Sequence, residues 1–151
     1  MKKFFKLFIL TGFFIGYSPF FPGTLASLLG LFFIIFLIKN KILYLIIFLL
    51  ATIFCLLFSN WGEKFFNKKD PKQIVIDEIA GMFISFFYLP SYNIKTYIIG
   101  FFLFRLLDIL KPTPIKYLEK MESGIGIILD DLIAGIFTNI LLRLIYKIFQ
   151  I

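Results

Sequence analysis

The sequence contains no histidine, and its single cysteine, Cys55, lies in the middle of an apolar run. No disulfide framework is therefore available, and a zinc site built from thiolate or imidazole ligands is disfavoured. An enzyme made from this chain would work without a histidine base and without a cysteine nucleophile beside a phosphate-binding loop. Carboxylates, hydroxyls and cationic side chains remain for chemistry.

Charged residues are also scarce, at 17% of the chain, whereas apolar residues make up 60%. Soluble domains contain about 45–50% apolar residues. Charges are missing from whole stretches long enough to form a helix, which compositional bias alone would not arrange. The 151 residues therefore predict a single integral-membrane domain, 1–151.

Basic residues outnumber acidic ones, 16 to 9, which gives a net charge of +7. No basic stripe with interleaved aromatic residues appears, so we expect no nucleic-acid partner. We interpret the lysines as topogenic, because cytoplasmic loops of membrane proteins carry an excess of Lys and Arg.

Several apolar runs follow one another, separated by short polar breaks. A helix that spans a bilayer needs about 20 apolar residues, so some runs are marginal unless they tilt or include polar ends. We predict an all-α, multi-pass membrane helical bundle with about five spans plus an N-terminal interfacial or re-entrant helix. The runs are Phe4–Phe21, Leu25–Ile38, Ile42–Phe58, Ile79–Leu89, Tyr97–Leu110 and Ile125–Phe149.

The basic loops predict the orientation of these spans. The breaks at 39–41 and 90–95 fall on the outer side if the lysine-rich loops are cytoplasmic. This alternation holds only if the run Phe4–Phe21 does not cross, ending at the breaker Pro19–Gly23. The lysines expected in the cytoplasm are Lys2, Lys3, Lys6, Lys64, Lys68, Lys69, Lys72, Lys111, Lys116 and Lys120.

This topology brings carboxylates from distant parts of the chain to one membrane edge. Each ionisable residue at bilayer depth costs about 2.5–3.5 kcal/mol on insertion scales, so a group of them calls for a function. A plainer explanation is that acids at helix starts interact with the helix dipole, worth about 0.3–1 kcal/mol each. The residues are Asp77 and Glu78 at the start of the third span, Asp108 at the end of the fourth, and Asp130 and Asp131 at the start of the fifth.

Two segments around these acids are alike. Asp77-Glu-Ile-Ala-Gly-Met-Phe83 and Asp131-Leu-Ile-Ala-Gly-Ile-Phe137 match at Asp, Ile, Ala, Gly and Phe, which indicates an internal repeat. Small residues below each acid favour close helix packing in membranes. Close packing would also bring the two acids near each other, and clustered carboxylate oxygens suit a hard cation such as Mg²⁺.

Cations and a helix start supply candidate phosphate ligands. One helical face carries Arg105, Asp108 and Lys111, each three residues after the one before it. Alternatively, Arg105 neutralises Asp108 and Lys111 extends to the headgroups. In Pro22–Ser27, free N–H groups near Thr24 and Ser27 favour an anion; the alternative is that Thr24 only caps the helix.

Four segments together resemble the phosphatidylglycerophosphatase A family, and the resemblance covers nearly the whole chain. They are Pro22–Ser27, Asp70–Gly81, Arg105-x-x-Asp108-x-x-Lys111-Pro112-x-Pro114-Ile115 and Gly124–Asp131. Ala26 departs from the glycine common in relatives. The resemblance implies a Mg²⁺-dependent phosphatase of the bacterial inner membrane that converts phosphatidylglycerophosphate to phosphatidylglycerol.

The mechanistic hypothesis assigns a role to each candidate. Metal ligands would be Asp77, Glu78, Asp130 and Asp131. Arg105 or Lys111 would balance charge on the phosphoryl group, and Asp108 would orient a cation or activate water, with an aspartyl nucleophile still open. The rival functions are a small ion or solute transporter using the acidic cluster and a CDP-alcohol phosphotransferase, whose D-x-x-D-G-x-x-A-R signature is missing.

Overall fold

The computed structural model describes residues 2–113, 115–118 and 125–149. Over these residues the chain forms seven α-helices and one 3-10 helix, with no strand, which confirms the all-α prediction. The predicted residues Lys120 and Gly124 lie outside the described part. The helices are α1 (Lys2–Leu10), η1 (Ile15–Tyr17), α2 (Pro22–Leu37), α3 (Lys41–Phe66), α4 (Ile76–Ser85), α5 (Ile94–Leu110), α6 (Ile115–Leu118) and α7 (Ile125–Phe149).

Local signals in the sequence explain where the long helices begin and end. The Asn40 side chain accepts a hydrogen bond from the Leu43 amide at 3.1 Å at the start of α3, and Asn93 accepts one from the Thr96 amide at 2.9 Å at the start of α5. Both helices end at a residue with positive φ, Asn67 for α3 and Lys111 for α5.

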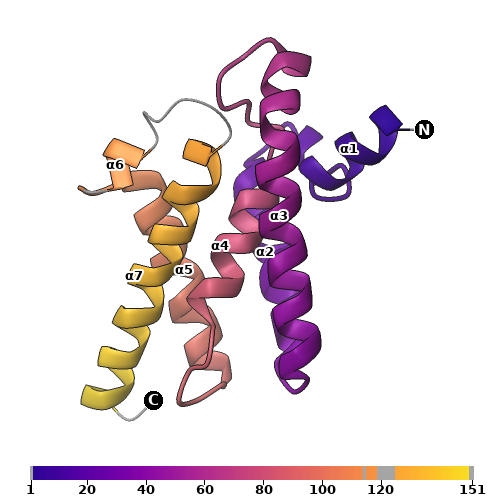
Figure 1. Ribbon diagram of the computed structural model, residues 1–151. Coiled ribbons are helices and arrows are strands. Elements are labelled where there is room, and N and C mark those ends of the chain that lie inside the picture. Colours follow the sequence, from indigo (N-terminus) through magenta and orange to yellow (C-terminus); the bar gives the residue numbers. More distant parts are fainter. Residues whose placement is uncertain (1, 114, 119–124, 150–151) are drawn as a thin grey trace.

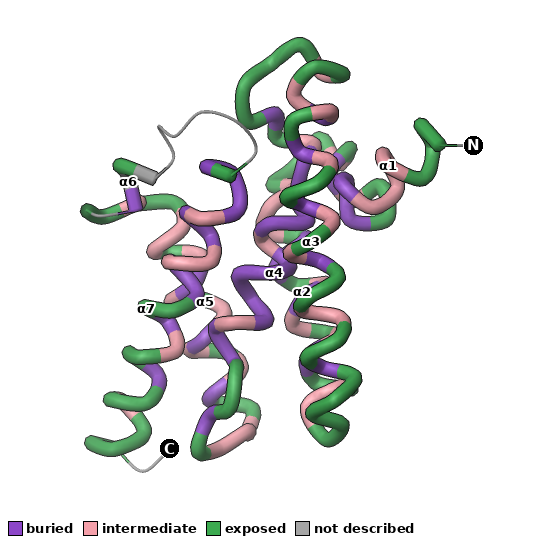
Figure 2. Tube along the Cα trace, viewed as in Figure 1, coloured by how far each residue is buried: buried purple, intermediate pink, exposed green. Residues whose placement is uncertain are grey.

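The short helix α4 is the centre of the bundle. It contacts α2, α3, α5 and α7, and eight of its ten residues are buried. Figure 1 shows α4 between the α2–α3 pair and the α5–α7 pair. The tube in Figure 2 is buried along most of α4, whereas the outer sides of α3 and α7 are largely exposed. The side chains of α4 are therefore positioned by contacts with four other helices.

The surrounding helices expose large apolar side chains. Phe36 on α2, Leu57 on α3 and Phe102 on α5 are each more than 60% exposed. Such a surface is unusual for a monomer in water and suits lipid. Among the described helices, α3 and α7 are long and apolar enough to cross a membrane, while α2 is apolar but has 16 residues. Length and composition alone thus give two candidate spans, and the predicted number of about five is not confirmed.

The N-terminal apolar run is broken into pieces. The nine residues of α1 rise about 13 Å, less than half of the roughly 30 Å hydrocarbon core. The chain then reverses through Phe13 and Phe14, both at positive φ, into the single turn of η1. The structure therefore agrees with a first run that does not cross.

Candidate active site

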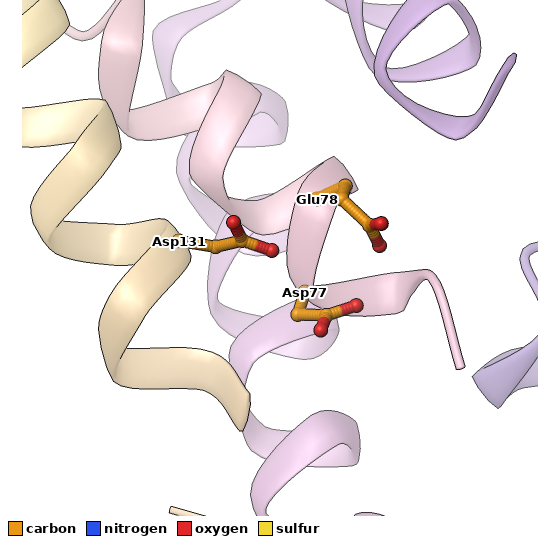
Figure 3. A group of neighbouring side chains, drawn as sticks. All are labelled: Asp77, Glu78 and Asp131. Atoms are coloured by element: carbon orange, nitrogen blue, oxygen red, sulfur yellow. The ribbon is translucent and has the colours of Figure 1, made fainter. Parts of the chain in front are cut away.

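Three carboxylates from two helices meet near one end of the bundle. Asp77 and Glu78 lie in the first turn of α4, and Asp131 lies in the second turn of α7. One oxygen of each lies within 4.8 Å of the others. Figure 3 shows the Asp131 side chain directed from α7 toward Asp77 and Glu78 on α4.

The glycines of the internal repeat explain how these helices approach so closely. A Cβ atom on Gly135 would collide with the carbonyl oxygen of Gly81, and a Cβ on Gly81 would lie 2.8 Å from the carbonyl oxygen of Asp131. The backbones of α4 and α7 are therefore in contact one turn beyond the acids. This confirms both meanings given to the repeat, helix packing and convergence of Asp77 with Asp131.

A third glycine brings the start of α2 to the same place. A Cβ on Gly23 would collide with Glu78 Oε1 and lie 3.3 Å from Arg105 Nη1. From the sequence, Gly23 was predicted only as part of a helix start. The sequence signal for Gly23 was the Pro22-Gly23 pair at the beginning of an apolar run, and such a pair is compatible with many other roles.

The three acids keep buried oxygens without a hydrogen-bond partner: Asp77 Oδ1, Glu78 Oε2 and Asp131 Oδ1. Asp77 and Asp131 are only 6% and 3% exposed. Unpaired buried carboxylate oxygens are costly, so such groups usually bind a cation or a proton. An all-oxygen donor set fits a hard divalent ion, and the structure therefore provides a site that could bind a metal.

Asp130 has a different partner, although it was predicted as a metal ligand. Its Oδ2 lies 2.6 Å from Lys111 Nζ, and its Oδ1 accepts a 3.1 Å hydrogen bond from the Asp131 amide. Adjacent residues on a helix are rotated by about 100°, so the two carboxylates face different neighbours. The described geometry groups Asp77, Glu78 and Asp131 and leaves Asp130 outside that group.

The Arg105 guanidinium lies beside these acids and is held by two groups. Nη1 lies 2.7 Å from Asp108 Oδ2, one helical turn away on α5, and donates a 3.3 Å hydrogen bond to Ser27 Oγ on α2. Arg105 Nε is buried without a partner. The expected pairing of Arg105 with Asp108 is therefore present, and it fixes the cation at the site.

Thr24 and Ser27, both predicted to bind phosphate, lie in different surroundings. Phe21, at positive φ, is the N-cap residue of α2 and makes no side-chain cap hydrogen bond, so Thr24 does not cap the helix. Thr24 lines the site cavity. Ser27 is fully buried, and its hydroxyl donates to the Gly23 carbonyl at 2.9 Å while accepting from Arg105. Ser27 thus positions Arg105 instead of facing a phosphate.

The carboxylates and cationic groups described above line one cavity of about 500 Å³. Six carboxylates and three cationic side chains line it, which gives a formal charge of −3. Asp70 and Lys72 belong to this lining, although the sequence analysis assigned Asp70 no role and used Lys72 only for topology. The lining residues are Phe21, Pro22, Gly23, Thr24, Asp70, Lys72, Ile74, Asp77, Glu78, Arg105, Asp108, Ile109, Lys111, Asp130 and Asp131.

Comparisons with known proteins point to one family. The family model described as "Phosphatidylglycerophosphatase A" matches residues 8–146. A Haemophilus influenzae protein named "Phosphatidylglycerophosphatase A" is 39% identical over 79% of this chain and 75% of its own length. An Escherichia coli protein of the same name is 32% identical over 85% of this chain and 76% of its own.

A Bacteroides thetaiotaomicron protein named "Putative phosphatidylinositol-3-phosphatase" is 35% identical over 94% of this chain and 95% of its own length. No solved structure matches. All three relatives are named as phosphatases of phospholipids, and two of the names agree on the lipid.

Proposed function

The chain belongs to the phosphatidylglycerophosphatase A family and is a phosphatase, and from this premise we propose that its substrate is phosphatidylglycerophosphate. The reaction releases the terminal phosphate as inorganic phosphate and leaves phosphatidylglycerol. Water supplies the oxygen that forms the new bond to phosphorus, and the bond from phosphorus to the glycerol oxygen breaks.

The observation that carries this proposal is the trio of Asp77, Glu78 and Asp131, each with a buried oxygen that has no hydrogen-bond partner, inside a negatively charged cavity. A phosphate monoester, itself an anion, would be repelled by a cavity of formal charge −3 unless a cation were bound. We infer that the trio holds Mg²⁺. When bound, this ion would supply charge stabilisation for the phosphoryl group and a more acidic water.

The protein's own cations complete the phosphate site. Arg105 is aligned by Asp108 and Ser27, so its guanidinium can bind two phosphoryl oxygens in a fixed orientation. Lys111 is held by Asp130 on the same cavity wall. Because phosphoryl transfer depends mainly on positioning and electrostatics, these pairs give Asp108 and Asp130 an orienting role. This is one of the two roles first considered for Asp108.

We also propose that the bundle crosses the bacterial inner membrane five times, with α2, α3, α4, α5 and α7 as the crossings. These helices run side by side in Figure 1, and the outer ones expose apolar side chains. Lysines within α1 and between α3 and α4 lie at the end of the bundle that holds the site (Figure 1). The excess of positive charge at that end supports a site facing the cytoplasm.

The distribution of acids argues against the rival transporter. Within the described ranges, every side-chain carboxylate except that of Glu63 lines the single active-site cavity. An ion path would need acids at several depths along the bundle. The placement therefore favours chemistry at one membrane edge.

The test measures release of inorganic phosphate from phosphatidylglycerophosphate with Mg²⁺ and with EDTA, in wild type, Asp77→Asn and Asp131→Asn. We expect EDTA and either substitution to reduce the rate by at least about a hundredfold. Glu63→Gln, outside the cavity, is the matched control and should keep the wild-type rate. Undiminished release in EDTA would refute the metal assignment, and undiminished release in both variants would refute the site.

A further inference from the structure

A second cavity adjoins the active site. It has a volume of about 490 Å³ and lies between the Tyr17–Phe20 turn and the segment that precedes α4. Phe21, Pro22 and Lys72 line both cavities, so these residues form the boundary between them. A ligand longer than one phosphate could occupy both spaces at once.

The walls of the second cavity are held against each other by backbone contacts. A Cβ on Gly16 would collide with the carbonyl oxygen of Gln73, so η1 at the start of this turn lies directly on the backbone of the residue after Lys72. The Val75 amide also donates a 2.9 Å hydrogen bond to the Leu10 carbonyl. These contacts fix the position of the turn and of Lys72 relative to Asp77, which lies two residues after Val75.

The two cavities differ in charge. The active-site cavity has six carboxylates and three cations, whereas Lys72 is the one charged residue among the described residues that line the second. In the active site, Arg105 and Lys111 are already paired with Asp108 and Asp130. Carboxylates repel an anionic group unless a metal ion is bound between them. An anionic group that is not bound to a metal ion is therefore better accommodated beside Lys72 than beside the carboxylates.

The far side of the second cavity is apolar and exposed. Phe20 and Phe21 are 74% and 77% exposed, and Phe21 has the left-handed φ of +48°, which is uncommon for a bulky residue. Exposed phenylalanines beside a lysine are typical of segments that lie in the lipid headgroup region. From the active site outward, the lining residues therefore change from carboxylates to Lys72 and then to phenylalanines.

We propose that the second cavity holds the phosphodiester of the lipid substrate, with the Lys72 ammonium binding a nonbridging oxygen. This inference rests on the proposed function, because phosphatidylglycerophosphate carries a terminal monoester and, across a glycerol bridge, a phosphodiester next to the diacylglycerol. The monoester occupies the active-site cavity, the diester lies beside Lys72, and the acyl chains leave past Phe20 and Phe21. Lys72 is then a specificity-determining residue that distinguishes a two-phosphate headgroup from a single phosphate monoester.

The experiment compares wild type, Lys72→Gln and Lys68→Gln with phosphatidylglycerophosphate in neutral detergent micelles. Lys68 is an exposed lysine of the same loop that lines neither cavity, so its substitution makes the same change in net charge. We expect Lys72→Gln to raise KM about tenfold, as expected for loss of a charge-assisted hydrogen bond, with a much smaller change in kcat. Lys68→Gln should leave both constants unchanged.

Two soluble inhibitors of the same reaction separate the subsites. Glycerophosphoglycerol carries only the diester, and inorganic phosphate can occupy only the monoester position. Because Lys72 lies at the boundary of both cavities, we expect Lys72→Gln to weaken inhibition by glycerophosphoglycerol much more than inhibition by phosphate. An unchanged KM in Lys72→Gln, or equal weakening of both inhibitors, would overturn the inference while leaving the proposed function intact. Absence of phosphate release by wild type would instead refute the proposed function.

Discussion

The neighbouring residues Asp130 and Asp131 differ in what surrounds their carboxylates. Asp130 is neutralised by Lys111, whereas Asp131 Oδ1 is buried with no partner beside Asp77 and Glu78. Asp130 therefore binds a cationic side chain of the protein, and Asp131 remains available to bind an external cation. This division follows from the helical rotation between adjacent positions.

The two aspartates should respond differently to substitution by asparagine. Asp131→Asn removes a charge from the cation site, so we expect loss of most activity and of Mg²⁺-dependent thermal stabilisation. Asp130→Asn frees Lys111 but leaves the trio intact, so we expect about a tenfold loss of activity with stabilisation by Mg²⁺ retained. Phosphate release and melting temperature in detergent, with and without Mg²⁺, check both. Loss of the Mg²⁺ effect in Asp130→Asn would show that Asp130 is a ligand after all.

How far the sequence predicts the site depends on the kind of signal each residue has. Asp77, Glu78, Asp108 and Asp131 were predictable because an acid in an apolar sequence is conspicuous. The partners were not, because the ion pair between Lys111 and Asp130 joins residues 19 positions apart across two helices. Chain spacing does not determine such a contact.

At the scale of elements, α4 is too short to cross a bilayer by itself. Its ten residues rise about 15 Å, half of the hydrocarbon core, and an irregular segment follows. Unpaired backbone groups are costly in lipid, so this segment needs partners from other elements. The predicted run Ile79–Leu89 missed this break, because Phe86–Leu89 are as apolar as the helix before them.

Side chains satisfy the carbonyl groups at the end of α4. Asn139 donates to the carbonyls of Ile84, Ser85 and Phe87, and Arg143 donates to those of Phe87 and Tyr88. The Tyr44 hydroxyl donates to the Phe83 carbonyl and the Tyr92 hydroxyl to that of Phe86. The positive charge of Arg143 also complements the negative end of the helix dipole.

Loss of these donors should destabilise the bundle more than it affects the chemistry. We expect Asn139→Leu and Arg143→Gln each to reduce the free energy of unfolding by about 1–3 kcal/mol, because carbonyl groups at and after the end of α4 lose their donors. Thermal denaturation in detergent measures the effect, and Lys147→Gln, on the same helix and exposed, is the control. An unchanged melting temperature in both variants would show that water or lipid headgroups satisfy the carbonyls instead.

The contact between α4 and α7 should be sensitive to a single methyl group. In Gly135→Ala the new Cβ meets the Gly81 carbonyl, so the helices must separate and Asp131 must move away from Asp77. We expect a loss of stability of about 1–3 kcal/mol together with a fall in activity greater than that loss explains. Ile136→Ala, at the exposed neighbouring position, should change neither by much. Full activity in Gly135→Ala would mean that the acids do not depend on this contact.

At the scale of the whole molecule, the described helices place the acids at one end and the 39–41 turn at the other. The 26 residues of α3 rise about 39 Å, which exceeds the hydrocarbon thickness, so its two ends should lie on opposite sides of the membrane. The sequence predicted this alternation from lysines. It also predicted about five crossings, but it could not show that α4 ends at Ser85, because the side chains that satisfy the end of α4 come from α7.

The proposed topology can be tested with the cysteine content of the chain. Cys55 is fully buried, so wild type should react little with a membrane-impermeant maleimide. Lys68→Cys lies beyond the end of α3 near the active site, and Lys39→Cys lies in the exposed turn before α3. We expect Lys68→Cys to be labelled in inside-out vesicles and Lys39→Cys in intact spheroplasts. Labelling of both from the same side would contradict a membrane-spanning α3, and the reverse pattern would place the carboxylates on the outer face and refute the proposed cytoplasmic site.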